Sequence, residues 1–301
     1  MQTSRNPDLG RGFLFGFTAY LIWGSFPLII TMLSFASPFE VVAWRVVFGC
    51  ALSVLLIAAT KGWASVRQVL REPKTLLWLV GAALLIYVNW QAYVIGILSG
   101  HVVETSLGYF INPLVTIVLA VFFLGEKLRQ LQWIAVGLGA LAVTVLTVDY
   151  GRLPWIALIL AASFGLYGLA KNKLGGRVSA LNSFAFESGF LVPVAIAQLL
   201  VLSGTGATIQ FGQAGLWPSL GLILFGIMTA IPLILFGAAA KRLPLSFIGF
   251  MQYLTPVIQF ILGLTVFQEH MPPVRWIGFI AVWGGLAVLS VDAVRSRSKR
   301  A

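Results

Sequence analysis

Charged residues are scarce in this sequence, and their scarcity excludes an ordinary water-soluble fold. Only 10% of the 301 residues are charged, 59% are hydrophobic, and the mean hydropathy is +0.96. A soluble domain carries about a quarter charged residues. The long apolar runs instead predict bilayer-spanning helices, each of which needs roughly 20 apolar residues. Because the runs are continuous rather than alternating, a lipid-facing β-barrel is not predicted.

Residues that bind metals or carry out redox chemistry are equally scarce. The single cysteine, Cys50, lies in an apolar run, so it excludes an intrachain disulfide and is interpreted as a small packing residue. The two histidines, His101 and His270, belong to no HExxH motif, and there is no CxxC motif, so we expect no metal site. GxSxG and the nucleotide-binding pattern GxxxxGK[ST] are also missing, which disfavours hydrolase activity and ATP-driven transport by this chain alone. We expect no cofactor, no catalytic residue and no enzymatic activity.

The net charge of +11 is explained by membrane topology better than by nucleic-acid binding, because the positive residues lie in short gaps between apolar runs. With the N-terminus in the cytoplasm, 17 of the 20 Lys and Arg residues fall on the cytoplasmic side, Arg152 and Arg275 fall outside, and Arg45 lies within a span. This bias predicts a multi-pass protein with both termini cytoplasmic. The ten predicted spans are residues 11–33, 40–60, 75–97, 103–124, 131–148, 153–171, 182–202, 216–239, 245–267 and 274–292.

Internal similarity divides the chain into two halves. A shift of 143 residues places Pro113 on Pro256 and Trp133 on Trp276. Each half would hold five helices, and because five is odd, the second copy must enter the membrane from the opposite side. Such inverted repeats usually place a substrate site near the midplane between them. The predicted parts are a cytoplasmic N-terminal tail at 1–10, a first five-helix repeat at 11–148, a second, inverted repeat at 153–292, and a basic cytoplasmic tail at 293–301.

Two prolines occupy matching places in the two halves. Pro113 follows Asn112, and Pro256 follows Thr255. Each proline removes a backbone donor and frees a carbonyl within an apolar helix, which weakens the helix locally. We interpret Pro113 and Pro256 as hinges or cavity walls; a static packing kink is the alternative.

Several stretches carry a resemblance to a known family. The segment NWQAYVIGILSGHVVETSLGYFINPLVTIVLAVFFLGEKL, residues 89–128, resembles the RarD branch of the EamA-like drug/metabolite transporter superfamily, and agreement extends to AYLIWGSFP (19–27), WR (44–45), FESGFLVP (186–193) and MQYLTP (251–256). The resemblance covers nearly the whole chain. It implies an all-α fold of ten transmembrane helices in two inverted EamA-type repeats, and a secondary transporter of the bacterial inner membrane. Gln268 departs from the family pattern, because the first half has Gly125 at the matching place.

Charged residues near or within spans are the first site candidates. Arg45 and Glu187 align at a shift of 142, so we expect them to pair, to gate a cavity or to hold a charged substrate. The alternative is a shallow position for each, with Arg45 snorkelling at the outer end of its helix and Glu187 near the cytoplasmic end. Glu104 opens a helix, where a carboxylate is stabilised by the helix dipole. Glu104 and Glu187 are also candidates for proton coupling.

The other substrate-binding or gating candidates are polar and aromatic residues well inside spans. Aromatic walls with a few amides suit an amphipathic organic substrate. The alternative is that the amides bond between helices and the aromatic rings belt the membrane interfaces. Gln252 and Gln259 are spaced to share one helix face, whereas adjacent residues cannot all face the same way. The candidates are Tyr20, Trp23, Asn89, Trp90, Gln91, Tyr109, Asn112, Tyr167, Gln252, Tyr253 and Gln259.

The sequence therefore predicts a secondary active transporter that moves a small organic metabolite, amino-acid-like compound or drug by alternating access. The resemblance favours export. The expected partners are a small-molecule substrate, the lipid bilayer and a coupling proton, with no nucleic acid, and the oligomeric state stays open. A flippase for a lipid or lipid-linked carrier is the alternative, and a passive channel, a scaffold or a membrane-embedded enzyme are the non-transport alternatives.

Overall fold

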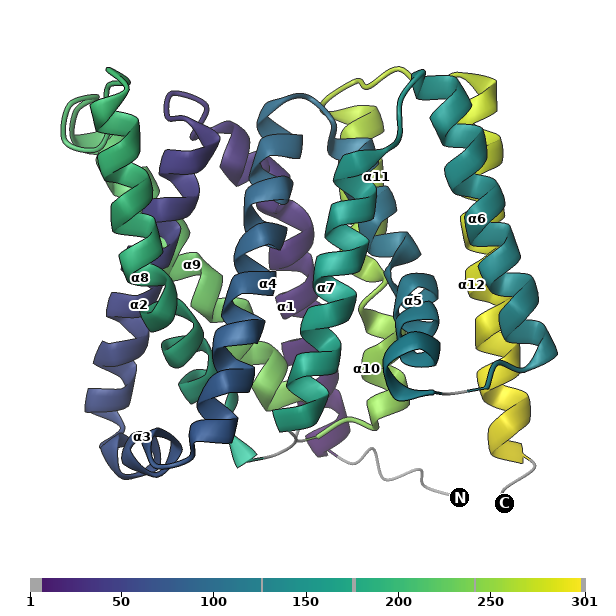
Figure 1. Ribbon diagram of the computed structural model, residues 1–301, viewed down its shortest axis with the longest axis horizontal. Coiled ribbons are helices and arrows are strands. Elements are labelled where there is room, and N and C mark those ends of the chain that lie inside the picture. The colour runs from purple at the N-terminus through teal and green to yellow at the C-terminus, as the bar shows by residue number, and fades with distance from the viewer. Residues whose placement is uncertain (1–6, 126, 175–176, 241, 299–301) are drawn as a thin grey trace.

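The computed structural model describes residues 7–125, 127–174, 177–240 and 242–298, and every regular element within those ranges is a helix. The helices form an elongated bundle in which α2 and α8 lie at one side and α6 and α12 at the other (Figure 1). In chain order they are α1 (Pro7–Thr31), α2 (Pro38–Ala59), α3 (Trp63–Leu70), α4 (Pro73–Leu98), α5 (Val102–Leu124), α6 (Gln130–Tyr150), α7 (Trp155–Leu174), α8 (Ala180–Gly204), α9 (Leu216–Ala240), α10 (Leu245–Met251), α11 (Leu254–Thr265) and α12 (Pro273–Ser298).

The described chain contains ten segments that are long and apolar enough to cross a membrane. This confirms the predicted all-helical, ten-span fold. Nine of these segments fall within single helices, and the ninth in chain order, Phe247–Thr265, runs through both α10 and α11. The short helix α3 was not predicted. It lies in the loop between the second and third spans and buries only Val69.

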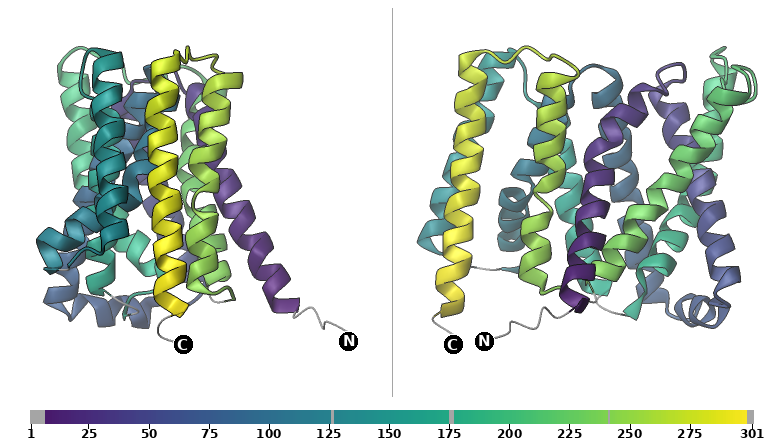
Figure 2. Two further views of the ribbon diagram at one scale, coloured as in Figure 1. Left: turned by 90° about the vertical axis from the view of Figure 1, so that its right-hand side faces the viewer. Right: turned by 180° about the vertical axis from the view of Figure 1, so that it is seen from behind.

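The start of α1 and the end of α12 lie at the same end of the bundle, as an even number of spans requires (Figures 1 and 2). Both helices extend past the apolar stretch: α1 begins at Pro7 and α12 continues to Ser298, so parts of the predicted tails 1–10 and 293–301 are helical. Helical hydrogen bonds are local and can continue into water beyond the bilayer.

Matching caps begin the two helices that carry Arg45 and Glu187. The Ser37 hydroxyl accepts a hydrogen bond from the Glu40 amide at the start of α2 (3.2 Å), and the Ser179 hydroxyl accepts one from the Asn182 amide at the start of α8 (3.2 Å). Each charged residue is therefore the eighth of its helix, about two turns in. Because α2 and α8 begin at opposite ends of the bundle, the two residues lie at opposite depths (Figure 1).

The helix pairings have a regular pattern. The contact of α5 with α7 has a counterpart in that of α11 with α1, the contact of α4 with α7 in that of α9 with α1, and the contact of α2 with α9 in that of α8 with α4. Exchanging the first five spans for the last five thus turns each of these pairs into another pair that also packs together. Two repeats related by a twofold axis would produce this pattern.

The two prolines behave differently. α5 is continuous through Pro113, whereas the ninth span is interrupted at Gln252 and Tyr253, three to four residues before Pro256. A proline ring clashes with the carbonyl four residues earlier, which here belongs to Gln252, so the interruption lies where proline should cause it. The break also overturns one expectation: Gln252 is exposed and Gln259 is buried, so they do not share a face of one helix.

Candidate functional site

Arg45 lies at the centre of a buried aromatic cluster. Its guanidinium stacks over Trp90 (4.2 Å from carbon ζ to the ring centroid), Phe225 (5.1 Å) and Phe26 (5.6 Å). Its Nε donates a hydrogen bond to the Thr229 hydroxyl (3.0 Å), and only 4% of the residue is exposed. The side chain thus contacts α1, α4 and α9 inside the bundle, which does not match the snorkelling alternative.

The close approach of α9 to α2 depends on a glycine. A Cβ atom at Gly226 would lie 2.6 Å from the Cβ of Phe48 and 3.3 Å from the carbonyl oxygen of Arg45. No side chain fits there without movement, so glycine is needed to bring Thr229, one turn further along α9, within reach of the guanidinium. Thr229 is itself fixed by a hydrogen bond from its hydroxyl to the Phe225 carbonyl (3.0 Å).

One polar atom of Arg45 is left without a partner. Nη1 is buried and makes no hydrogen bond within the described part of the chain. Buried polar groups are nearly always paired, and an unpaired cation in a membrane interior is costly. Nη1 of Arg45 can therefore donate a hydrogen bond that no described residue accepts.

A second unpaired atom belongs to Gln259. Its Nε2 donates to the Tyr93 hydroxyl (2.9 Å) and to the Trp23 carbonyl (3.4 Å), but its Oε1 is buried and unpartnered among the described residues. The Trp23 ring lies edge-on to that of Tyr20 at 5.5 Å. Gln259 and Trp23, both predicted as candidates, therefore meet where α11 packs against α1, and the candidate Tyr20 contacts the Trp23 ring.

The amides and hydroxyls on the α7 side are satisfied by contacts between helices. Asn89 donates to the Leu160 carbonyl and the Ser163 hydroxyl (both 3.1 Å) and accepts from the Tyr109 hydroxyl (3.2 Å). Asn112 donates to the Ala161 carbonyl (3.0 Å). These bonds join α4 and α5 to α7, so for Asn89 and Asn112 the helix-bridging alternative describes the structure.

The adjacent residues Asn89, Trp90 and Gln91 point in three directions, as helix geometry requires. Asn89 faces α7 and Trp90 faces Arg45. Gln91 faces α8, where its Nε2 donates to the Oε1 of Gln198 (3.1 Å).

Glu187 belongs to a separate cluster and does not pair with Arg45. It forms an ion pair with Lys171 (2.7 Å) and accepts hydrogen bonds from the hydroxyls of Tyr167 (3.1 Å) and Ser183 (2.7 Å). Of the roles considered for these two residues, direct pairing does not occur, because α2 and α8 begin at opposite ends of the bundle and Lys171 already neutralises Glu187. Tyr253, in the interruption of the ninth span, packs against a third cluster, which contains Phe110 and Phe279.

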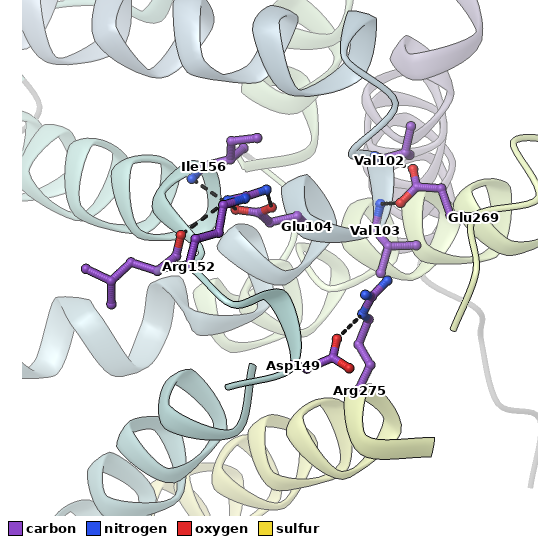
Figure 3. Close-up of polar contacts among 9 residues, drawn as sticks. Val102, Val103, Glu104, Asp149, Arg152, Ile156, Glu269 and Arg275 are labelled. Atoms are coloured by element: carbon purple, nitrogen blue, oxygen red, sulfur yellow. Dashed lines mark hydrogen bonds and ion pairs between the residues drawn. The ribbon is translucent and has the colours of Figure 1, made fainter. Parts of the chain in front are cut away.

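An ionic cluster lies where α5, α7 and α12 begin and α6 ends (Figure 3). This is the end of the bundle opposite the N-terminus of α1 and the C-terminus of α12 (Figure 1). Glu104, which is 1% exposed, pairs with Arg152 (2.8 Å) and accepts the Ile156 amide (3.1 Å), so it caps the start of α7 rather than its own helix. Asp149 pairs with Arg275 (2.8 Å). A pocket of about 420 Å³ opens here, lined by Gly100, His101, Glu104, Tyr150, Arg152, Glu269, His270 and Arg275.

Glu269 caps α5 from the loop between α11 and α12. Its carboxylate accepts the amides of Val102 and of Val103 (3.1 Å) (Figure 3). Burial raises the pKa of Glu269 from 4.5 to about 7, although the two amides and the charge of Arg275 oppose that shift. Glu126, which the shift of 143 residues places at the matching position of the first half, lies outside the described residues.

Sequence reasoning missed Phe26, Tyr93, Phe225 and Thr229, all of which surround the two unpaired atoms. Their residue types are as common on lipid-facing surfaces as in binding sites. Only the presence of Arg45 within a predicted span could have pointed to them, because they lie on the helices that pack around it.

The fold and this buried polar centre define a multi-pass membrane protein with the architecture of a solute transporter. The chain belongs to the EamA-like transporter family, whose model matches residues 10–148. It is 46% identical over 285 residues to Protein RarD of Streptomyces exfoliatus, covering 95% of this chain and 90% of the relative. It is 38% identical over 291 residues to an uncharacterized transporter of Pseudomonas aeruginosa, covering 96% of each.

A solved crystal structure shares the fold. It matches with a TM-score of 0.60 and 20% identity, over 94% of this chain and 98% of the other. The family match and the relatives confirm the expected RarD-like identity within the drug/metabolite transporter superfamily, and the chain is a membrane transporter of that type.

Proposed function

We propose that this chain is a secondary carrier that moves small organic solutes across the bacterial inner membrane, with its binding site at Arg45. The observation that carries the proposal is the unpaired Nη1 of Arg45, buried among aromatic rings of α1, α4 and α9. These rings come from both predicted halves. A packed structural core gains nothing from an unpaired cation, whereas a binding site uses one.

Alternating access is the mechanism we propose. It is supported by the exchangeable helix pairings, which allow the two halves to rock about the site, and by the helix break at Gln252 and Tyr253, beside α1. The ionic cluster of Glu104, Arg152, Asp149 and Arg275 would close one end of the path and separate when that end opens.

Proton coupling is proposed at Glu104 and Glu187. Both carboxylates are buried. Glu104 on α5 is paired with Arg152 from the loop before α7, and Glu187 on α8 is paired with Lys171 from α7. Protonation of either carboxylate would remove its attraction for that cation and so weaken a contact between helices. We propose that both termini are cytoplasmic and that the direction of transport is export.

Counterflow in proteoliposomes tests the proposal. Purified protein would be assayed with amino acids, aromatic acids and amphenicol-type drugs, with and without a pH gradient. We expect saturable counterflow that Arg45→Ala abolishes. Absence of counterflow for every compound, with a folded protein, would contradict a carrier of small solutes and move attention to lipid-linked substrates.

Direction is tested separately in intact cells. Cells that express the chain should retain less of the identified substrate than cells without it, and higher retention would contradict export.

A further inference from the structure

Two unpaired polar atoms of opposite kind occur in one aromatic cluster. Nη1 of Arg45 is a buried donor, and Oε1 of Gln259 is a buried acceptor. Tyr93 belongs to the same cluster: its hydroxyl accepts a hydrogen bond from Gln259 Nε2, and its ring lies in one core with Phe26 and Phe225, over which the Arg45 guanidinium stacks. The rings of Phe26, Tyr93 and Phe225 belong to the same core cluster, with Trp23, Trp90 and Tyr109 packed against it.

The positive charge of Arg45 is not balanced by a carboxylate within the described part of the chain. The groups in contact with it are the hydroxyl of Thr229 and three aromatic rings. The acidic residue predicted to pair with it, Glu187, is bound to Lys171. A neutral solute would leave the charge unbalanced, and a cationic solute would be repelled.

We propose that the solute is an organic anion with one carboxylate, an aromatic or apolar body, and a neutral N–H or O–H donor. Its carboxylate accepts a hydrogen bond from Nη1 of Arg45, and its donor binds Oε1 of Gln259. Its body packs against the rings of the cluster. This inference rests on the proposed function, because it assigns the substrate class of the same site.

Matched acids and amides test the charge requirement. The probes are indole-3-acetate, indole-3-lactate and 3-phenyllactate, each compared with its primary amide, and tryptamine is the cationic analogue. Binding is measured by the shift in unfolding temperature of purified protein, and transport by counterflow in phosphatidylcholine vesicles. We expect each acid to bind at least about tenfold more tightly than its amide, since a hydrogen bond to a charged group is worth that much.

Variants assign the preference to named atoms. Arg45→Met should abolish the preference for acids, and Arg45→Lys should restore part of it. Gln259→Leu should weaken the binding of 3-phenyllactate more than that of 3-phenylpropionate, which has the same carboxylate and ring but no N–H or O–H donor. Arg67→Met, which removes an exposed positive charge on α3, is the matched control and should retain the full preference. A cooperative unfolding transition in each variant shows that it is folded.

The inference is overturned if amides bind as tightly as acids, if acids bind to none of the folded preparations, or if an acid preference survives in Arg45→Met. Counterflow of a neutral amphenicol in the same vesicles would leave the carrier proposal standing while the anion inference fails. If phosphatidylglycerol added to the purified protein abolishes the shift in unfolding temperature that the acids produce, the site holds a lipid headgroup and the inference is wrong.

Discussion

At the scale of single residues, an unpaired polar group is unfavourable in a membrane interior, so the contacts of each polar group indicate its role. Asn89 and Asn112 donate hydrogen bonds to carbonyls of α7 and hold helices together. Arg45 keeps one donor unused. Its three ring contacts, in a desolvated site, stabilise the cation by about 2 kcal/mol each, and they offset much of the several kcal/mol that withdrawing a guanidinium from water costs. The unpaired Nη1 is the part of that cost that no described contact offsets.

Replacing Arg45 by methionine should make the purified protein more stable while it loses transport. Met fills a similar volume and removes the desolvation cost, and the Thr229 hydroxyl keeps its bond to the Phe225 carbonyl. Buried charges replaced by apolar residues often stabilise a protein by about 1 kcal/mol or more, which for a chain of this size is about 2 °C in unfolding temperature. Thermal unfolding in detergent measures it.

A purely structural Arg45 would give the opposite sign, with a lower unfolding temperature in Arg45→Met. Arg67→Met again serves as the matched control. Its charge is exposed on α3, so its removal should leave the unfolding temperature nearly unchanged.

At the scale of helices and loops, α5 is held by a carboxylate from a distant segment. Glu269, between α11 and α12, accepts two amides at the start of α5. Free amides at a helix start attract negative charge. The groups that surround this carboxylate come from several elements. They are His101 and Glu104 at the start of α5, Asp149 and Tyr150 at the end of α6, Arg152 in the loop that follows, His270 before α12, and Arg275 in the first turn of α12.

Glu269 should make folding stability depend on pH. Its pKa rises from 4.5 to about 7 on folding, so between those values the folded state binds the proton more tightly than the unfolded state. This contribution to stability is complete below pH 4.5 and is lost as the pH rises through about 7. We expect the unfolding temperature to fall between pH 5.5 and pH 8 by about 2 °C more in the native chain than in Glu269→Gln.

His270→Gln controls for the neighbouring imidazole, and it should retain most of the pH dependence that Glu269→Gln removes. Equal pH dependence in the native chain and in Glu269→Gln would show that the carboxylate is ionised throughout this range.

Hydropathy predicted the helices of this molecule well because lipid allows few alternatives to a continuous apolar helix. The break at Gln252 and Tyr253 was not predicted, because Pro113 has the same local signal and α5 continues through it. What differs is the surroundings, which one chain segment cannot reveal. The opposite depths of Arg45 and Glu187, by contrast, agree with the alternative read from the sequence, which placed Arg45 at the outer end of its helix and Glu187 near the cytoplasmic end.

At the scale of the whole molecule, the two predicted halves contact each other along most of their helices, among them α5 with α7, α1 with α11, and α6 with α12. Movement of one half against the other would have to separate the segments that meet at the ionic cluster. The pocket there is shared by the loop before α5, which carries His101, and the loop before α12, which carries His270. These loops belong to different halves, so a covalent link between them would prevent the pocket from widening.

Cross-linking that pocket should stop transport. In a Cys50→Ala background, which removes the single native thiol, the double variant His101→Cys, His270→Cys would be treated with a short bifunctional thiol reagent. We expect counterflow to fall to background after treatment and to return when a reducible linker is cleaved. Each single cysteine variant, treated in the same way, controls for the bulk of the reagent and should retain most of its activity. Full counterflow in the cross-linked double variant would show that this end of the bundle does not open during transport, and that the solute path lies elsewhere.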